Sequence, residues 1–185
     1  MSTEFKINWE AITQYHIYGK ELNDPYDICR IMKKKGTRRY VYSITHIRKM
    51  SQPAFVIKHG MSGDYSRNHG ERVYRQFAHL KSWGDKRIKG SSGAEFRIIL
   101  DDILEKYGID VDHRDLIITI YDLTDYPFTM VDVWLEINKI EAHFINEHVR
   151  FFGEKPIGNI SDEHNALFRP SIRKETFSSL FETGK

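Results

Sequence analysis

Cysteine is almost absent from this chain of 185 residues, and long apolar segments are missing altogether. The single cysteine, Cys29, excludes an internal disulfide framework and a thiolate-rich zinc site, because both need several cysteines. No segment approaches the roughly 18 to 20 apolar residues of a membrane span, and the first residues lack the apolar stretch of a secretory signal. These absences predict a soluble protein that works in the cytoplasm.

A strong net charge is missing as well. The formal charge is +2 at pH 7, which by itself does not predict nucleic-acid binding. The distribution is more informative, because acids gather between Asp101 and Asp132 while basic residues gather in earlier runs. Such segregation can place a basic face against phosphates, although each run taken alone fits a solvated surface equally well. The basic residues are Lys33, Lys34, Lys35, Arg38, Arg39, Arg67, Arg72, Arg75, Lys81, Lys86, Arg87 and Lys89.

Turn residues and hydrophobic spacing predict the helices. The first helix should run from Pro25 to Gly36, with Asp24 as its cap and Gly36 as its stop. The lysines at 33–35 would meet the dipole of its last turn favourably, so phosphate binding is a second use for them. Further helices are expected over residues 70–83, 92–107 and 130–150. The helix over 92–107 has a capping box at Ser92 and a stop at Gly108.

Strands are expected over residues 39–47, 53–59 and 115–122, where Tyr, Val, Ile and Phe are frequent. The first two should form a hairpin with a long polar loop, and the third should be buried. The fold class is therefore α/β of the α+β kind: a small, three-stranded, mostly antiparallel sheet flanked by helices. We expect one domain over 39–160, preceded by a helical, basic extension over 1–38 and followed by a polar tail over 161–185.

Glu141 is the most informative single residue. It lies four residues after Ile137 and four before Ile145, which places a carboxylate on the apolar flank of its own helix. A buried carboxylate needs a cation, hydrogen-bond donors or a metal ion. A salt bridge to an arginine would satisfy it. A magnesium-type ion held by one carboxylate, waters and a substrate phosphate would also satisfy it.

Arg75 and His79 are one helical turn apart and so face the same way. Arginine suits a phosphodiester, because its planar fork donates two parallel hydrogen bonds and stays charged. Arg72, one turn earlier, competes for this role. An ion pair between Arg75 and Glu71 is the structural alternative.

Tyr42 and Lys58 lie on the two strands of the predicted hairpin, where side chains approach across the pair. A lysine beside a tyrosine would lower the pKa of the phenol and favour Tyr42 as a general base on water. Both residues are equally compatible with ordinary strand positions.

Taken in order, these residues resemble the motifs of the GIY-YIG nuclease superfamily. The core of that family has two strands, two helices, a third strand and a helix with an invariant acid. Its two triplets would correspond to Tyr40-Val41-Tyr42 and Lys58-His59-Gly60. Its later motifs would correspond to Arg75 with His79, to Glu141 with Ile145, and to Pro156 with Asn159. The resemblance covers residues 39 to 160.

Some letters of the family pattern are changed. Tyr40 stands where the first triplet has glycine, and the second triplet keeps only Gly60. The hairpin loop is long, and a polar insertion precedes Arg75. A lysine at the place of Lys58 occurs in restriction-endonuclease branches of the family, beside the tyrosine base. The resemblance is therefore to restriction-type enzymes.

The resemblance implies a DNA endonuclease of restriction, phage or mobile-element type that uses one Mg²⁺ or Mn²⁺ ion per site. Tyr42 would take a proton from water with the help of Lys58. Arg75, supported by His79, would stabilise the charge on phosphorus, and Glu141 would hold the metal ion. The resemblance further assigns Gly60 and Asn159 supporting roles, with Asn159 ordering the end of the active-site helix. The DNA backbone would contact Lys33, Lys34, Lys35, Arg38, Arg39 and Arg72.

A catalytically inactive nucleic-acid-binding module with the same fold is the alternative hypothesis. The complete catalytic set argues against it, because a pure binding module has no need of an acid such as Glu141 that repels phosphate. In either case the expected partner is double-stranded DNA, and no membrane is expected. A palindromic recognition site would favour a homodimer.

Overall fold

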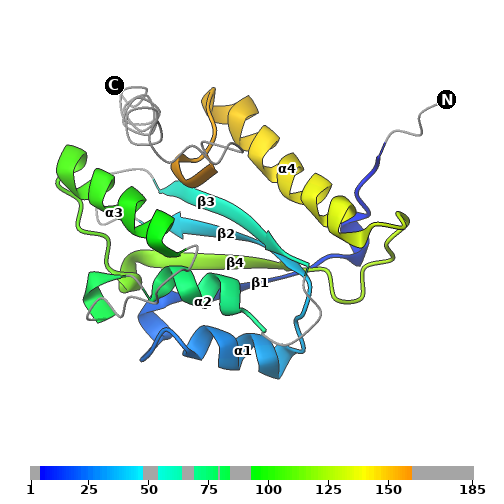
Figure 1. The fold of residues 1–185 in the computed structure, drawn as a ribbon, viewed down its shortest axis with the longest axis horizontal. Coiled ribbons are helices and arrows are strands. Elements are labelled where there is room, and N and C mark those ends of the chain that lie inside the picture. Colours follow the sequence, from blue (N-terminus) through cyan, green and yellow to red (C-terminus); the bar gives the residue numbers. More distant parts are fainter. Residues whose placement is uncertain (1–4, 48–53, 64–68, 79, 84–92, 160–185) are drawn as a thin grey trace.

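The computed structural model describes residues 5–47, 54–63, 69–78, 80–83 and 93–159. These residues form a four-stranded antiparallel sheet and four α-helices (Figure 1). The strands are β1 (Thr13–Tyr18), β2 (Tyr40–His46), β3 (Phe55–Ser62) and β4 (Leu116–Asp122). The helices are α1 (Asp27–Lys35), α2 (Glu71–Phe77), α3 (Gly93–Tyr107) and α4 (Val133–Phe152). Single 3-10 turns cover Trp9–Ala11, Gly19–Glu21, Lys81–Trp83, His113–Asp115 and Ile157–Asn159.

The sheet has the strand order β1-β4-β2-β3, so the expectation of three strands is wrong by one. The additional strand, β1, pairs with β4 and lies at one edge of the sheet. Within β1 only Ile17 is buried, which leaves a weak hydrophobic signal. The region before residue 39 therefore contributes to the same sheet as the rest.

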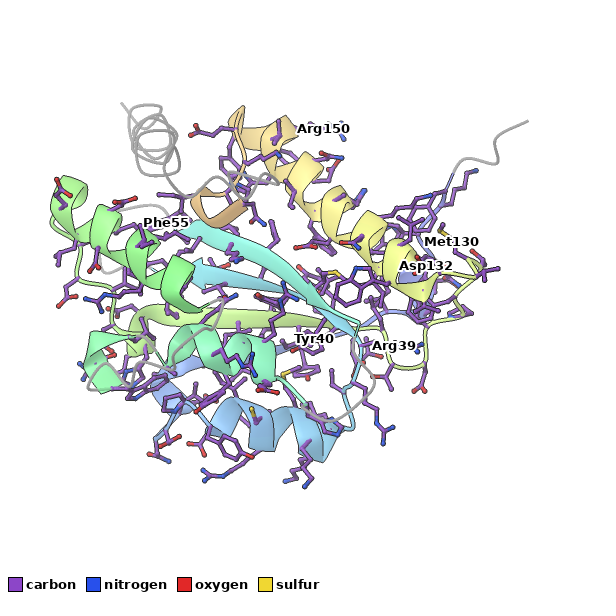
Figure 2. All side chains as sticks on the ribbon, in the orientation of Figure 1. Arg39, Tyr40, Phe55, Met130, Asp132 and Arg150 are labelled. Atoms are coloured by element: carbon purple, nitrogen blue, oxygen red, sulfur yellow. The ribbon has the colours of Figure 1, made fainter. Side chains whose placement is uncertain are left out.

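The expected hairpin of β2 and β3 and the buried strand β4 are confirmed. Tyr40 pairs with Ser62, and the register shifts by a bulge between Ile44 and Thr45. Figure 2 shows the two strand starts, Tyr40 and Phe55, at opposite ends of the sheet, as an antiparallel pair requires. In this order β3 is the second edge strand.

Helix α1 begins two residues later than its predicted start. The Asp24 carboxylate accepts a hydrogen bond from the Tyr26 N–H at 2.7 Å, which forms a local turn and does not cap the helix. The carboxylate of Asp27 accepts from the Asn23 N–H at 2.9 Å and closes the same turn. Gly36 ends the helix with a φ of 76°, as expected, because glycine adopts the left-handed conformation without steric cost.

The other helices are also shorter than or shifted from their predicted ranges. Helix α2 ends at Phe77, and a separate 3-10 turn follows it. The capping box predicted at Ser92 lies outside the described residues, while Gly108 has a φ of 65° and ends α3 as expected. Helix α4 begins at Val133, because the Asp132 carboxylate accepts a hydrogen bond from the Leu135 N–H at 3.1 Å.

Two hydrophobic clusters lie on opposite faces of the sheet. On one face α1, α2 and α3 pack against a row that includes Tyr42, Ile44 and Ile118. On the other face α4 packs through Ile137 and Ile140. Helix α4 also contacts the edge strand β3 (Figure 1). Among the described residues, no helix is long and apolar enough to cross a membrane.

Candidate active site

Tyr42 of β2 lies directly opposite Gly60 of β3 in the sheet register. A methyl group on the Gly60 α-carbon would overlap the ring and the hydroxyl group of Tyr42. The phenol therefore lies across the edge strand, in space that only glycine leaves open. This geometry gives a physical reason for the supporting role assigned to Gly60.

Two side chains of α2 act on the hydroxyl group of Tyr42. The amide nitrogen of Gln76 donates a hydrogen bond to it at 2.6 Å. The positive charge of Arg72 also acts on this hydroxyl group and lowers the pKa of the phenol. Arg72 and Gln76 are four residues apart, so they lie on the same side of their helix. Tyr42 and Gln76 are buried and Arg72 is exposed, which places Arg72 between the phenol and solvent.

Arg75, the predicted phosphate ligand, forms an ion pair with Glu71, which is the structural alternative that its spacing offered. The structure therefore places Arg72, and not Arg75, at the Tyr42 hydroxyl. His79 lies outside the described residues.

Gln76 is missing from the predicted set, although the helical pattern contains a signal for it. Val73 is fully buried and marks the face of α2 that packs on the sheet. At about 100° per residue, Gln76 lies roughly 60° from Val73, whereas Arg75 lies roughly 200° from it, on the opposite side. The rotational position relative to the apolar face thus favours Arg72 with Gln76 over Arg75.

Burial raises the pKa of the Tyr42 phenol to about 12. The positive charge of Arg72 opposes this shift in pKa, and the negative charge of Glu141 adds to it. The phenol therefore has a raised pKa and not the lowered one expected beside Lys58, because desolvation outweighs the positive charge of Arg72. Tyr42 is a neutral phenol at neutral pH.

Lys58 lies on the same face of the sheet as Tyr42, because it pairs with Ile44, two residues further along β2. It is half-buried. The turn Ile157–Asn159 packs against it, since a methyl group on Gly158 would come within 2.7 Å of the Lys58 Cβ. Lys58 is therefore held next to Tyr42 by a segment that follows α4.

Asn159 attaches this turn to the edge strand. Its amide oxygen accepts a hydrogen bond from the His59 N–H at 2.7 Å, and its amide nitrogen donates to the His59 carbonyl at 2.8 Å. The side chain thus extends the hydrogen-bond ladder of β3 by one step. Asn159 orders the strand that carries Lys58 and Gly60, and not, as expected, the end of the active-site helix.

Glu141 of α4, in the other layer, is half-buried, and its charge contributes to raising the pKa of Tyr42. The described residues contain no group of three or more His, Cys, Asp or Glu side chains that could hold a metal ion. Mg²⁺ does not require such a group, since it keeps several waters and binds through one or two carboxylates and substrate phosphates. The single carboxylate of Glu141 fits this mode of binding.

A second acid of α4, Glu136, is more deeply buried but has a structural explanation. Its carboxylate accepts hydrogen bonds from the backbone N–H groups of Thr129 and Met130 at 2.8 and 2.7 Å. It therefore fixes the loop before the helix, where Figure 2 marks Met130. Burial alone does not identify a metal ligand among these acids.

The basic residues assigned to the DNA backbone differ in their surroundings. The three lysines at 33–35 are exposed on the last turn of α1, and Arg38 is exposed after it. Arg39 is half-buried, and its guanidinium carbon lies 5.3 Å from the centre of the Phe128 ring. Packing therefore accounts for Arg39 better than a phosphate contact does.

No protein-family model, no curated protein and no solved structure matches this chain. Its function is therefore inferred from the sequence motifs and the geometry of the site.

Proposed function

We propose that the chain is a divalent-metal-dependent endonuclease of the GIY-YIG type that hydrolyses phosphodiester bonds in double-stranded DNA. One observation carries this proposal: two elements besides its own strand act on the Tyr42 hydroxyl. Gln76 of α2 is hydrogen-bonded to it, and the charges of Arg72 of α2 and Glu141 of α4 act on it. The succession of β2, β3, α2, α3, β4 and α4 supports the proposal, because it is the order of elements in that superfamily.

Arg72 takes the role of the phosphate ligand. Its guanidinium group is exposed and already lies at the phenol, and its planar fork can bind a phosphate oxygen and Tyr42 together. Movement of Arg72 onto the phosphate would also open a path for water to the Tyr42 oxygen. The ion pair of Arg75 with Glu71 favours Arg72 over Arg75 in this role.

Tyr42 accepts the proton of the attacking water, and Gln76 holds its hydroxyl group in place. The charge of Arg72 favours the phenolate form, and a second cation, Lys58, stands on the same face of the sheet. An Mg²⁺ or Mn²⁺ ion held by Glu141 would supply Lewis-acid stabilisation of the phosphate and of the leaving oxygen. A restriction-type role follows from the lysine at position 58.

A catalytically inactive DNA-binding module is the second candidate, and one observation favours it. Tyr42 is fully buried, and its pKa is raised to about 12, so the phenol stays protonated unless the substrate changes its surroundings. The two candidates differ in whether the protein cuts DNA, not in whether it binds DNA.

Cleavage of supercoiled and long linear DNA in Mg²⁺, Mn²⁺ or EDTA separates them. Unmodified and methylated genomic DNA should both be used, so that a rare or modification-dependent site is not missed. Tyr42→Phe keeps the ring over Gly60 and removes only the hydroxyl group. We expect this variant and Glu141→Gln to lose about 100-fold or more in cleavage rate, because each removes a group that acts in the transition state.

Arg72→Ala and Arg75→Ala form a matched pair on one helix. We expect Arg72→Ala to lose about 100-fold or more in rate and Arg75→Ala to lose less than about 10-fold. Equal losses would contradict the assignment of Arg72. If the wild type binds DNA but does not cut it in Mg²⁺ or Mn²⁺, the inactive module is favoured. If folded Glu141→Gln cuts DNA at the wild-type rate, the proposed metal site is refuted.

A further inference from the structure

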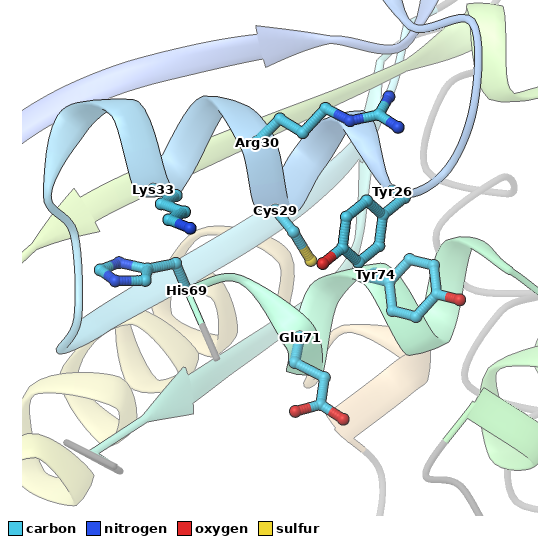
Figure 3. A pocket seen from close by; sticks show the side chains of 7 residues that line it. All are labelled: Tyr26, Cys29, Arg30, Lys33, His69, Glu71 and Tyr74. Atoms are coloured by element: carbon cyan, nitrogen blue, oxygen red, sulfur yellow. The ribbon is translucent and has the colours of Figure 1, made fainter. Parts of the chain in front are cut away.

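A cavity of about 420 Å³ lies between α1 and the start of α2 (Figure 3). Its volume falls in the range of cavities that hold small organic ligands. Cys29 lines it, and burial together with the charge of Glu71 raises the pKa of this thiol to about 11. Cys29 therefore stays an uncharged thiol at neutral pH.

One end of the cavity is suited to an anion. The exposed Lys33 and the half-buried His69 lie beside each other there (Figure 3). His69 places Nδ1 at 2.6 Å from the Thr37 carbonyl, and because a carbonyl only accepts, Nδ1 carries a hydrogen. This bond fixes the orientation of the ring, and in the imidazolium form Nε2 also carries a hydrogen that it can donate to a phosphate oxygen.

The other end of the cavity is aromatic. The rings of Tyr26 and Tyr74 lie 5.6 Å apart at an interplanar angle of 88°. The guanidinium carbon of Arg30 lies 5.4 Å from the centre of the Tyr26 ring, and Arg30 is itself ion-paired with Asp27. These contacts hold Tyr26 in place although it is 51% exposed.

We propose that this cavity binds one unpaired nucleotide of a DNA strand, with its base against Tyr26 and Tyr74 and its phosphate at Lys33 and His69. Aromatic rings stack on any base, and cations bind the backbone, so this combination is typical of sites for unpaired nucleotides. Glu71 also lines the cavity, and its carboxylate, which forms an ion pair with Arg75, can accept a hydrogen bond from a base amino or imino group. A free phosphate would not explain the aromatic end, and an apolar ligand would not explain the cationic end.

The cavity and the candidate active site both use residues of α2. Glu71 lines the cavity, and the charge of the next residue, Arg72, acts on Tyr42. A nucleotide in the cavity would therefore lie close to the phosphate bound by Arg72. This inference rests on the proposed nuclease function for its substrate, and it adds that the preferred DNA has an unpaired nucleotide beside the scissile bond.

Equilibrium binding in EDTA tests the proposal without any need for cleavage. Three DNAs of one sequence are compared by fluorescence anisotropy: a fully paired duplex, the duplex with one bulged nucleotide, and the duplex with a single-stranded overhang. We expect at least one unpaired form to bind about 10-fold or more tightly than the paired duplex, because stacking on aromatic side chains contributes strongly to affinity. Preference for the bulge would identify an extruded base, and preference for the overhang a strand end.

Variants then assign the preference to the cavity. The double variant Tyr26→Leu/Tyr74→Leu should lose the preference, whereas Tyr26→Phe/Tyr74→Phe, which keeps both rings, should retain it. Lys33→Ala should weaken binding of the unpaired DNA more than Lys34→Ala, which changes an exposed neighbour outside the cavity.

Equal affinity for paired and unpaired DNA, or a preference that survives the leucine and Lys33→Ala substitutions, would overturn the proposal. If the protein shows no preference for unpaired DNA but cuts paired duplex, the nuclease function stands and the cavity proposal fails. If it prefers unpaired DNA but cuts no DNA, the cavity proposal stands and the nuclease function fails.

Discussion

At Gly60 the absence of a side chain determines where the Tyr42 hydroxyl group lies. Strand positions opposite a tyrosine usually carry a side chain that supports the ring from the side. Here the ring of Tyr42 lies over the bare α-carbon of Gly60, which brings the hydroxyl group to Gln76 and Arg72. The same position therefore controls both the packing of the ring and the chemistry of the site.

Gly60→Ala should displace the Tyr42 ring, because the added methyl group overlaps it. We expect a loss of about 1 to 3 kcal/mol in the free energy of unfolding, typical of overpacking a well-filled core, and a lower cleavage rate. Urea unfolding measures the first effect. In a Tyr42→Ala background the ring is absent and the cost of Gly60→Ala should nearly vanish. The same cost in both backgrounds would contradict the contact.

At the scale of elements, the sequence predicts the central parts of the fold and misses its edges. The hairpin strands β2 and β3 and the strand β4 are rich in buried β-formers, so composition identifies them. Edge strand β1 has little to distinguish it, since most of its residues are exposed or half-buried. For α2 the pattern predicts the helix, but the choice between Arg72 and Arg75 depends on its rotation against the sheet.

The link between Asn159 and β3 could not be predicted, because the two hydrogen-bonding partners are 100 residues apart in the chain. Spacing rules describe neighbours within one element, and no local pattern reports a side chain that completes a distant strand. The resemblance identified Asn159 as important but assigned it to the wrong element. Its actual partner, the backbone of His59, becomes visible only when β3 and the last turn are packed together.

Asn159→Ala should release the turn Ile157–Asn159 from the edge of β3. We expect the His59 amide proton to exchange faster, and unfolding to become easier by about 1 to 3 kcal/mol, because the variant leaves a partly buried donor and acceptor without partners. Hydrogen exchange measures the first effect and urea unfolding the second. Asn23→Ala, at an exposed position, serves as the control. An unchanged exchange rate at His59 would show that the link contributes nothing.

At the scale of the whole molecule, the two faces of the sheet surround neighbouring polar side chains of β3 differently. Lys58 and His59 are neighbours in β3, but they face opposite sides. On the α4 side His59 is buried, shares a hydrogen bond of 2.7 Å with Ser43, and lies 6.3 Å from the His148 ring centre. Burial, with the charge of His148, lowers the pKa of His59 to about 4. The folded protein therefore holds this imidazole neutral.

This burial should make the folded state sensitive to mild acid. The unfolded chain binds a proton at His59 near its ordinary pKa of about 6.5, whereas the folded protein binds it only near pH 4. The stability that depends on neutral His59 is complete above pH 6.5 and declines as the pH falls from 6.5 to 4. Between pH 7 and pH 5 the wild type should lose roughly 2 kcal/mol more unfolding free energy than His59→Gln, in which this group does not titrate. Urea unfolding at the two pH values measures the difference, and equal losses in both proteins would show that His59 does not couple folding to pH.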